Sequence, residues 1–309
     1  MPALRSLRAG LPDAEIVLIG LPEAREFAAR FDAYLDGFLP LPGVPGLPEQ
    51  PPQPERIPAF LEAARRLRFD LAVQLHGSGA VTNPLTALLG ARLTAGFHPP
   101  DGPCPDARRF LPYPAAGPEV RRLLRLTAFL GLPDRGEALE FPLREPDERA
   151  LRAHPAAASL RPGGYVCVHP GGRGPARRWP PEHFAAVADG LAQRGLRVVL
   201  TGTAAERGIA RAVAGAMGTE PPLDLTGCTS LGALAALLAG ARLLVCNDTG
   251  VSHLAAALRR PSVVVFTGSE PERWAPLDRD RHRALVRPQP EAVLAEADRL
   301  LNREGIHAA

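Results

Sequence analysis

Short apolar runs and amphipathic stretches alternate along the second half of the chain. The apolar runs, typical of strands buried on both faces, occupy residues 165–169, 196–201, 223–225, 242–246 and 262–266. Helices are predicted between them at 181–194, 204–217, 230–239 and 250–258, with a last helix at 291–301. Strands that alternate with helices at this spacing predict a parallel sheet covered on both faces.

The first half shows the same alternation less regularly. Helices are predicted at 2–11, 22–31, 59–68, 82–89 and 119–130, and strands at 15–19, 69–75 and 92–97. Eight prolines between residues 39 and 58 predict a rigid, extended connection, and residues 98–118 are expected to be rich in loops. The sequence opens with a helix, whereas a doubly wound domain normally opens with a strand and a glycine-bearing loop.

The chain of 309 residues is long enough for two domains with separate cores. Residues 139–162 show no core pattern and carry four prolines, so we expect the linker between the domains there. The predicted organisation is an N-terminal α/β domain over 1–150, a C-terminal α/β domain over 160–290, and a closing helix over 291–309.

The composition of the chain argues against several classes of function. A net charge of +3 and an aromatic content of 5% argue against nucleic-acid binding. All 36 basic residues are arginine, which excludes a Schiff-base or P-loop lysine. Four cysteines without a CxxC pair indicate a reducing compartment, and neither a signal peptide nor an apolar run of 18 residues is present, so we expect a cytoplasmic protein. The Arg-rich segments are interpreted as helix faces exposed to solvent. Peripheral contact of these segments with the inner membrane is the alternative.

The segment from Asp248 to His253 follows a buried strand and opens a helix. Asp248, Thr249 and Gly250 form the turn, and the free N–H groups and positive dipole end of a helix starting there suit a phosphate at the carboxyl edge of a parallel sheet. His253 lies one turn into the helix. The alternative is an ordinary turn with a capping aspartate and a surface histidine.

Two further turns carry candidate chemistry. Gly171 and Gly172 follow a strand and would let backbone N–H groups approach a diphosphate, with Arg173 and Arg177 as the positive charge. The spacing misses the dinucleotide fingerprint, so a dehydrogenase is disfavoured, and a surface arginine cluster is the alternative. Glu206 lies just past the next strand. Its carboxylate can accept hydrogen bonds from both hydroxyls of a ribose, or it can interact favourably with the positive end of the helix dipole.

The order of these motifs resembles glycosyltransferase family 9, the ADP-heptose:lipopolysaccharide heptosyltransferases and their relatives. The resemblance rests on Asp248-Thr249-Gly250-x-x-His253, the His169-Pro170-Gly171 element and the Arg178-Trp179-Pro180 element. It is strong over residues 165–276 and weaker over 2–97. It implies a GT-B architecture, in which two doubly wound, Rossmann-like α/β domains face a cleft.

The resemblance also implies a function. The chain would transfer heptose or a related sugar from a nucleotide diphosphate donor, ADP-heptose-like, to a lipid-linked oligosaccharide acceptor of the lipopolysaccharide core. The reaction would invert the anomeric centre and use no metal or other cofactor; Asp278-Arg279-Asp280 is interpreted as a surface loop rather than a metal motif. The implied donor-binding residues are Gly171, Gly172, Arg173, Arg177, Glu206, Thr229, Asp248, Thr249, Gly250 and His253, with Thr229 at the nucleobase.

One part of the family pattern is missing from this sequence. The family's catalytic base is an aspartate in a Gly-Asp loop after a first strand, and neither stands in this sequence. Met1 is then either an internal methionine or the start of a truncated protein, and the base is unassigned, with Asp13 and His76 as guesses. The alternatives are a catalytically impaired nucleotide-sugar-binding protein of the same fold and a hydrolase or epimerase on this scaffold.

Overall fold

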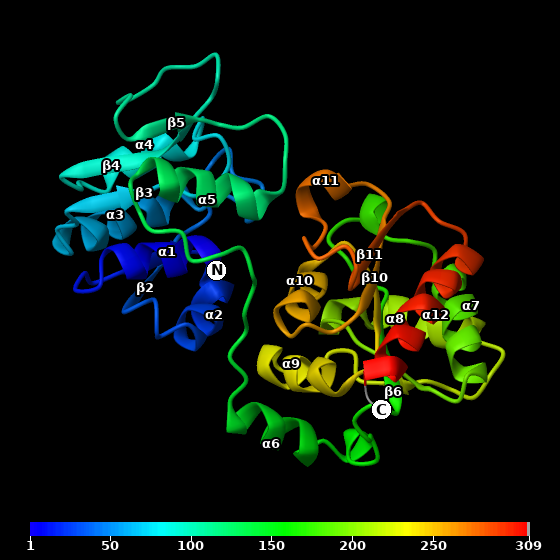
Figure 1. The fold of residues 1–309 in the computed structure, drawn as a ribbon. Helices are drawn as coiled ribbons and strands as arrows, with labels where there is room; N and C mark the ends of the chain where they lie inside the picture. The colour runs from blue at the N-terminus through cyan, green and yellow to red at the C-terminus, as the bar shows by residue number, and fades with distance from the viewer. Residues whose placement is uncertain (308–309) are drawn as a thin grey trace. The chain divides into compact units, whose positions relative to one another are not determined.

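The computed structural model describes residues 1–307 and divides into two compact units after Glu137. Both are α/β units in which every paired strand is parallel (Figure 1). Among the described residues, no helix combines the length and apolarity needed to cross a bilayer.

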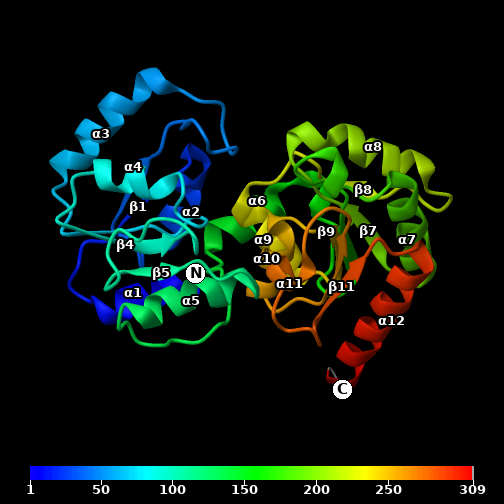
Figure 2. The same ribbon diagram turned by 90° about the horizontal axis from the view of Figure 1, so that it is seen from above.

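The first unit contains two small sheets, one of order β1-β2 and one of order β3-β4-β5. Strands β1, β4 and β5 of this unit are labelled in Figure 2. Its strands are β1 (Val17–Gly20), β2 (Gly37–Pro40), β3 (Leu71–Val73), β4 (Leu93–His98) and β5 (Phe110–Pro112). Its α-helices are α1 (Pro2–Gly10), α2 (Arg25–Arg30), α3 (Ile57–Arg66), α4 (Thr82–Leu88) and α5 (Glu119–Phe129).

Two strands of this unit lie in segments expected to be connection or loop. β2 enters the proline-rich stretch, and β5 lies within residues 98–118. Both are edge strands that end on a proline, Pro40 and Pro112. Proline is tolerated at a strand end or a sheet edge because its missing N–H leaves no central ladder bond unmade. These two short strands were not predicted from the sequence, although the segments around them are otherwise extended or rich in loops.

The second unit is built on one six-stranded parallel sheet of order β11-β10-β9-β6-β7-β8. The strands are β6 (Tyr165–His169), β7 (Arg197–Leu200), β8 (Leu223–Asp224), β9 (Leu244–Asn247), β10 (Ser262–Phe266) and β11 (His282–Val286). The helices are α6 (Glu145–Ala153), α7 (Pro181–Gln193), α8 (Arg207–Ala216), α9 (Leu231–Gly240), α10 (Gly250–Ala257), α11 (Pro271–Trp274) and α12 (Pro290–His307).

The central strands bury side chains on both faces of this sheet. Val166 and Val168 of β6 join a core with α7 and α12, whereas Cys167 between them joins a core with α9 and α10. Successive side chains of a strand point to opposite faces, so an apolar run supplies both cores at once. Each of these three residues has no exposed surface.

Residues 139–162, expected to be a linker without core contacts, contain the helix α6. The backbone N–H of Arg144 donates to the Asp147 carboxylate over 2.9 Å and caps the start of this helix. Leu151 of α6 packs partly buried against the core that includes α9. Because α6 contacts α9, it belongs to the second unit, and the division between units falls before it.

Candidate functional site

The order of the sheet in the second unit reverses beside β6. From β6 the chain proceeds outward through β7 and β8, and then returns to the other side of β6 at β9. In open parallel sheets, ligands bind at such a switch point, beyond the carboxyl ends of the strands. The turns that follow β6, β7 and β9 carry most of the candidate residues, so the fold places them at this edge.

Asn247, the last residue of β9, ties two of these turns together. Its side-chain amide donates to the carbonyl oxygens of Pro170 and Gly171 over 2.8 and 3.1 Å, and its oxygen accepts from the Trp179 N–H over 3.0 Å. The residue has no exposed surface. A buried amide with these three bonds fixes the path of the loop after β6 relative to β9.

Asp248 is buried and anchors Arg177. Its Oδ2 accepts from the Arg177 guanidinium at 2.5 Å and from the Ser269 hydroxyl at 2.6 Å, and its own N–H donates to Val265 over 3.0 Å. The structure therefore brings together two candidates that stand 71 residues apart. The Arg177 side chain remains 37% exposed, so its guanidinium is held at the rim of the site.

Glu206 faces the glycine turn after β6. Its Oε2 accepts from the N–H and the hydroxyl of Thr203 over 2.7 and 2.9 Å. Burial opposes ionisation of this carboxyl group, but the two bonds from Thr203, helped by the neighbouring His169 and the N–H of Gly172, outweigh it and hold the pKa of Glu206 below its ordinary value. A Cβ atom on Gly171 would stand 2.2 Å from Oε1 of Glu206, so only glycine lets this carboxylate lie where it does.

Gly172 lies close to the turn that opens α10, which contains Thr249 and Gly250. A Cβ on Gly172 would lie 3.4 Å from the Thr249 methyl group, so the two turns approach closely. The Thr249 hydroxyl is buried without a hydrogen-bond partner among the described residues. A Cβ on Gly250, the first residue of α10, would meet nothing within 4 Å. The start of α10 thus offers backbone donors beside open space at Gly250, next to the buried, unengaged Thr249 hydroxyl.

Two histidines near the turns are held neutral by burial. Burial lowers the pKa of His253, although the Asp248 charge opposes that effect. Burial also lowers the pKa of His169, whose Nδ1 lies 3.0 Å from the Thr201 hydroxyl and whose Nε2 lies 4.0 Å from Glu206. A protonated His253 beside a diphosphate therefore requires the ligand's own charge to raise that pKa.

The remaining candidates lie at the margins of these turns. Thr229 follows Gly227, whose N–H donates to Gly202 over 2.8 Å and so joins this turn to the one carrying Glu206. Gly227 has a φ of +71° and lies tightly against Ala204. Both features require glycine at this position. Arg173 lies exposed on the loop after β6.

The charged loop around Asp278 does not belong to the turns at the carboxyl edge of the sheet. Asp278 accepts the N–H groups of Asp280 and Arg281, each over 3.1 Å, which is a turn-forming role. Within the described residues, no group of three potential ligands could hold a metal ion.

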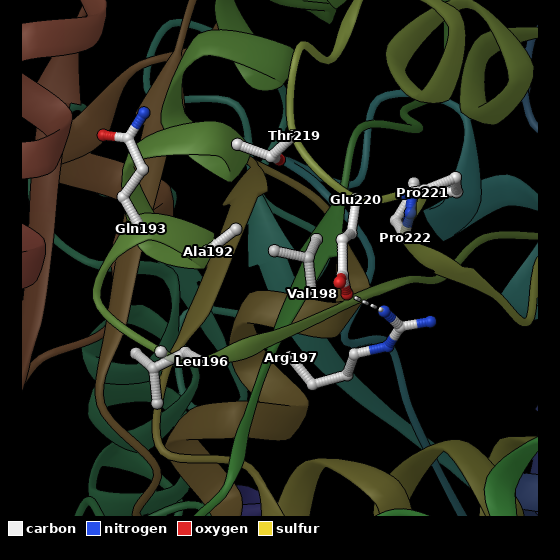
Figure 3. Close-up of a pocket in the computed structure, with 10 residues that line it drawn as sticks. Ala192, Gln193, Leu196, Arg197, Val198, Thr219, Glu220, Pro221 and Pro222 are labelled. Carbon is white, nitrogen blue, oxygen red and sulfur yellow. Dashed lines mark ion pairs between the residues drawn. The ribbon is translucent and has the colours of Figure 1, made fainter.

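A hollow of about 420 Å³ lies at the amino ends of β7 and β8, where Arg197 pairs with Glu220 over 3.6 Å (Figure 3).

Both guesses for a catalytic base, Asp13 and His76, lie in the first unit. Asp13 is an exposed residue of the turn between α1 and β1 in the first unit. His76 follows β3, and its Nε2 lies 3.3 Å from a Glu49 carboxylate oxygen. The base therefore stays unassigned.

Sequence reasoning missed Asn247 and Ser269. Asn247 is an amide at the end of an apolar strand, a pattern that indicates a buried polar anchor and could have been noticed. Ser269 gives no such signal, because only the fold places it beside Asp248.

The model of glycosyltransferase family 9 (heptosyltransferase) matches residues 59–301. Lipopolysaccharide heptosyltransferase 2 of Salmonella typhimurium is 32% identical over an alignment 157 residues long, and the alignment covers 43% of this chain and 45% of the relative. The chain thus spans less than half the length of that curated relative. A family 9 glycosyltransferase structure from Veillonella parvula superposes with a TM-score of 0.79 at 21% identity and covers 98% of this chain and 92% of its own.

The structure of the Escherichia coli ADP-heptose lipopolysaccharide heptosyltransferase II superposes with a TM-score of 0.72 at 23% identity, covering 98% of this chain and 94% of its own. These neighbours share the GT-B fold of two Rossmann-like domains. The family match extends over most of the chain and includes every candidate donor-binding residue. The chain belongs to glycosyltransferase family 9 (heptosyltransferase).

Proposed function

We propose that the protein is a glycosyltransferase that moves heptose or a related sugar from ADP to an acceptor of the lipopolysaccharide core. The observation that carries the proposal is the cluster at the switch point, where Glu206, the Arg177–Asp248 pair and the start of α10 surround two glycines. The names of the relatives, a lipopolysaccharide heptosyltransferase and an ADP-heptose transferase, supply the sugar and the acceptor.

The donor's diphosphate would lie at the start of α10. The Thr249 hydroxyl, which has no partner among the described residues, and the N–H groups of Thr249 and Gly250 are donors for its oxygens. Gly171 and Gly172 would let the backbone after β6 approach from the other side. Arg177, with Arg173 on the same loop, would supply positive charge.

The nucleoside would lie toward β7. The Glu206 carboxylate, kept ionised by Thr203, is suited to accept the two ribose hydroxyls. Thr229, in the adjoining turn, would lie at the nucleobase. Asp248 would act mainly by positioning Arg177, since a carboxylate repels a diphosphate.

The reaction would be an inverting displacement without a metal ion. Backbone dipoles of the second unit and the Arg177 guanidinium would stabilise the negative charge that develops on the departing diphosphate. His253, neutral in the free protein, would gain a proton as that charge approaches and would then donate to it. A base would remove the proton from the acceptor hydroxyl.

We place the reaction in the cytoplasm, where the four free thiols would stay reduced. A lipid-linked acceptor would bring the protein into peripheral contact with the inner membrane.

The test incubates the protein with ADP-heptose and with lipopolysaccharide core that lacks heptose. Release of ADP that requires the acceptor, with heptose found on the acceptor, is the expected result. Donor binding without transfer would favour the second candidate, a nucleotide-sugar-binding protein without turnover. Free heptose formed without acceptor would indicate a hydrolase.

A further inference from the structure

The chain bends directly after β10 at Thr267, Gly268 and Ser269, and we call this segment the β10 bend. It lies against the loop that carries Arg177. The Thr267 hydroxyl donates to the carbonyl oxygen of Ala176 over 3.0 Å. A Cβ atom on Gly268 would stand 2.8 Å from that same oxygen and 3.5 Å from Cγ of Arg177. The β10 bend therefore contacts the backbone immediately before Arg177 and leaves no room there for a larger residue than glycine.

The third residue of the β10 bend contacts the carboxylate that holds the Arg177 guanidinium. The Ser269 hydroxyl donates to Oδ2 of Asp248 over 2.6 Å, and the same oxygen accepts from Arg177 at 2.5 Å. The terminal torsion of an aspartate is broad, so hydrogen bonds decide where its two oxygens lie. The Ser269 hydroxyl thus holds Oδ2 at the point where the guanidinium meets it.

The β10 bend is itself anchored by the sheet. Phe266, the last residue of β10, has no exposed surface, and β10 lies between β9 and β11. Arg287, just after β11, donates from its backbone N–H to the Phe266 carbonyl over 2.9 Å and from Nε to the Thr267 carbonyl over 3.2 Å. The loop at residues 173–176, by contrast, is exposed. The anchored bend can therefore support the exposed loop that leads to Arg177.

We propose that the β10 bend positions Arg177 for the donor's diphosphate and thereby raises the affinity for the nucleotide. The inference rests on the proposed function, in which Arg177 supplies positive charge to that diphosphate. An arginine side chain loses much rotamer freedom when it is fixed, so holding it before the ligand arrives reduces the cost of binding. The three residues of the bend act through Arg177 and need no contact with the nucleotide.

The test compares variants that remove a hydroxyl of the β10 bend with variants that keep it. Ser269→Ala and Thr267→Val remove the hydroxyl, whereas Ser269→Thr and Thr267→Ser retain it. Ser159→Ala, at an exposed serine of the same unit, is the matched control. Calorimetric titration with ADP is carried out on each variant, and on Ser269→Ala and Thr267→Val each combined with Arg177→Ala.

We expect Ser269→Ala and Thr267→Val each to weaken ADP binding by about five- to tenfold, because each removes one hydrogen bond from the support of Arg177. Ser269→Thr and Thr267→Ser should retain most of the affinity, and Ser159→Ala should retain all of it. In the Arg177→Ala background, neither hydroxyl deletion should weaken binding further, since residues that act through one side chain are not additive. A general loss of structure would instead persist in that background.

A second measurement needs no nucleotide. The backbone N–H groups of Arg177 and Arg178 donate within the loop, to Gly174 over 3.2 Å and to Pro175 over 3.1 Å. Hydrogen exchange at these two amides should be about fivefold faster in Thr267→Val than in the unmodified chain or in Thr267→Ser. Residues 244–247 of β9 serve as the internal reference.

The two measurements separate this inference from the proposed function. If the unmodified chain binds ADP, equal affinity in the hydroxyl-deleted variants, or losses that persist in the Arg177→Ala background, would overturn the inference alone. If the unmodified chain binds no ADP, the proposed function fails. Hydrogen exchange then decides whether the β10 bend holds the Arg177 loop, and unchanged exchange in Thr267→Val would overturn that as well.

Discussion

Replacing Gly171 by alanine tests the contact between the glycine turn and Glu206. The new Cβ would stand 2.2 Å from Oε1 and 2.3 Å from the carboxyl carbon of Glu206. Non-bonded carbon atoms normally lie about 3.5–4.0 Å apart, so the carboxylate must withdraw by more than about 1 Å. It would leave the position in which Thr203 now holds it.

The expected loss of binding free energy is set by the hydrogen bonds that Glu206 would no longer make. A hydrogen bond to a charged group contributes about 1.5–3 kcal/mol, so losing one ribose contact of Glu206 predicts a loss of about 2 kcal/mol. That corresponds to about 30-fold weaker binding of ADP, measured by calorimetric titration. Gly208→Ala in α8 is the control, since its Cβ would meet nothing within 4 Å. Unchanged ADP affinity in Gly171→Ala would refute the assignment of Glu206 to the ribose.

Two further predictions concern the stability of the second unit. Asn247→Leu leaves two carbonyl oxygens and one N–H without their partner and should lower the free energy of unfolding by about 3 kcal/mol in urea titrations; an unchanged midpoint would contradict its role as an anchor. Burial lowers the pKa of His282 to about 4, below the unfolded value of 6.5, so the folded state binds fewer protons and its stability, full above the unfolded pKa, falls as pH drops toward 4. The expected loss between pH 7.5 and pH 5 is about 2 kcal/mol, and His282→Asn should flatten this dependence; an equal slope in the variant would show that other groups cause it.

The second unit was the easier one to predict from sequence. Its central strands are buried on both faces, so they appear as uninterrupted apolar runs such as residues 262–266. The edge strand β11 carries Arg283 between its apolar residues and was missed, because an edge strand needs less apolar surface. The helix α6 was missed because it offers few apolar residues, and its start depends on the Asp147 cap.

The candidate site could be predicted as a set of turns but not as a network. Each turn joins a strand to a helix and carries polar residues, which sequence shows directly. The pairing of Arg177 with Asp248 depends on β6 and β9 being neighbours, which the order of residues along the chain does not reveal. The roles of the individual donor-binding residues stay predictions until a nucleotide is bound.

Calorimetric titration with ADP, with UDP and GDP as comparison, tests the central claim of a nucleotide-sugar site most directly. The proteins are the full chain, Arg177→Ala and, as a matched control, Arg211→Ala on the exposed surface of α8. We predict preferential binding of ADP that weakens in Arg177→Ala and is unchanged in Arg211→Ala. Absence of binding to any of the three nucleotides, or equal weakening in both variants, would contradict it.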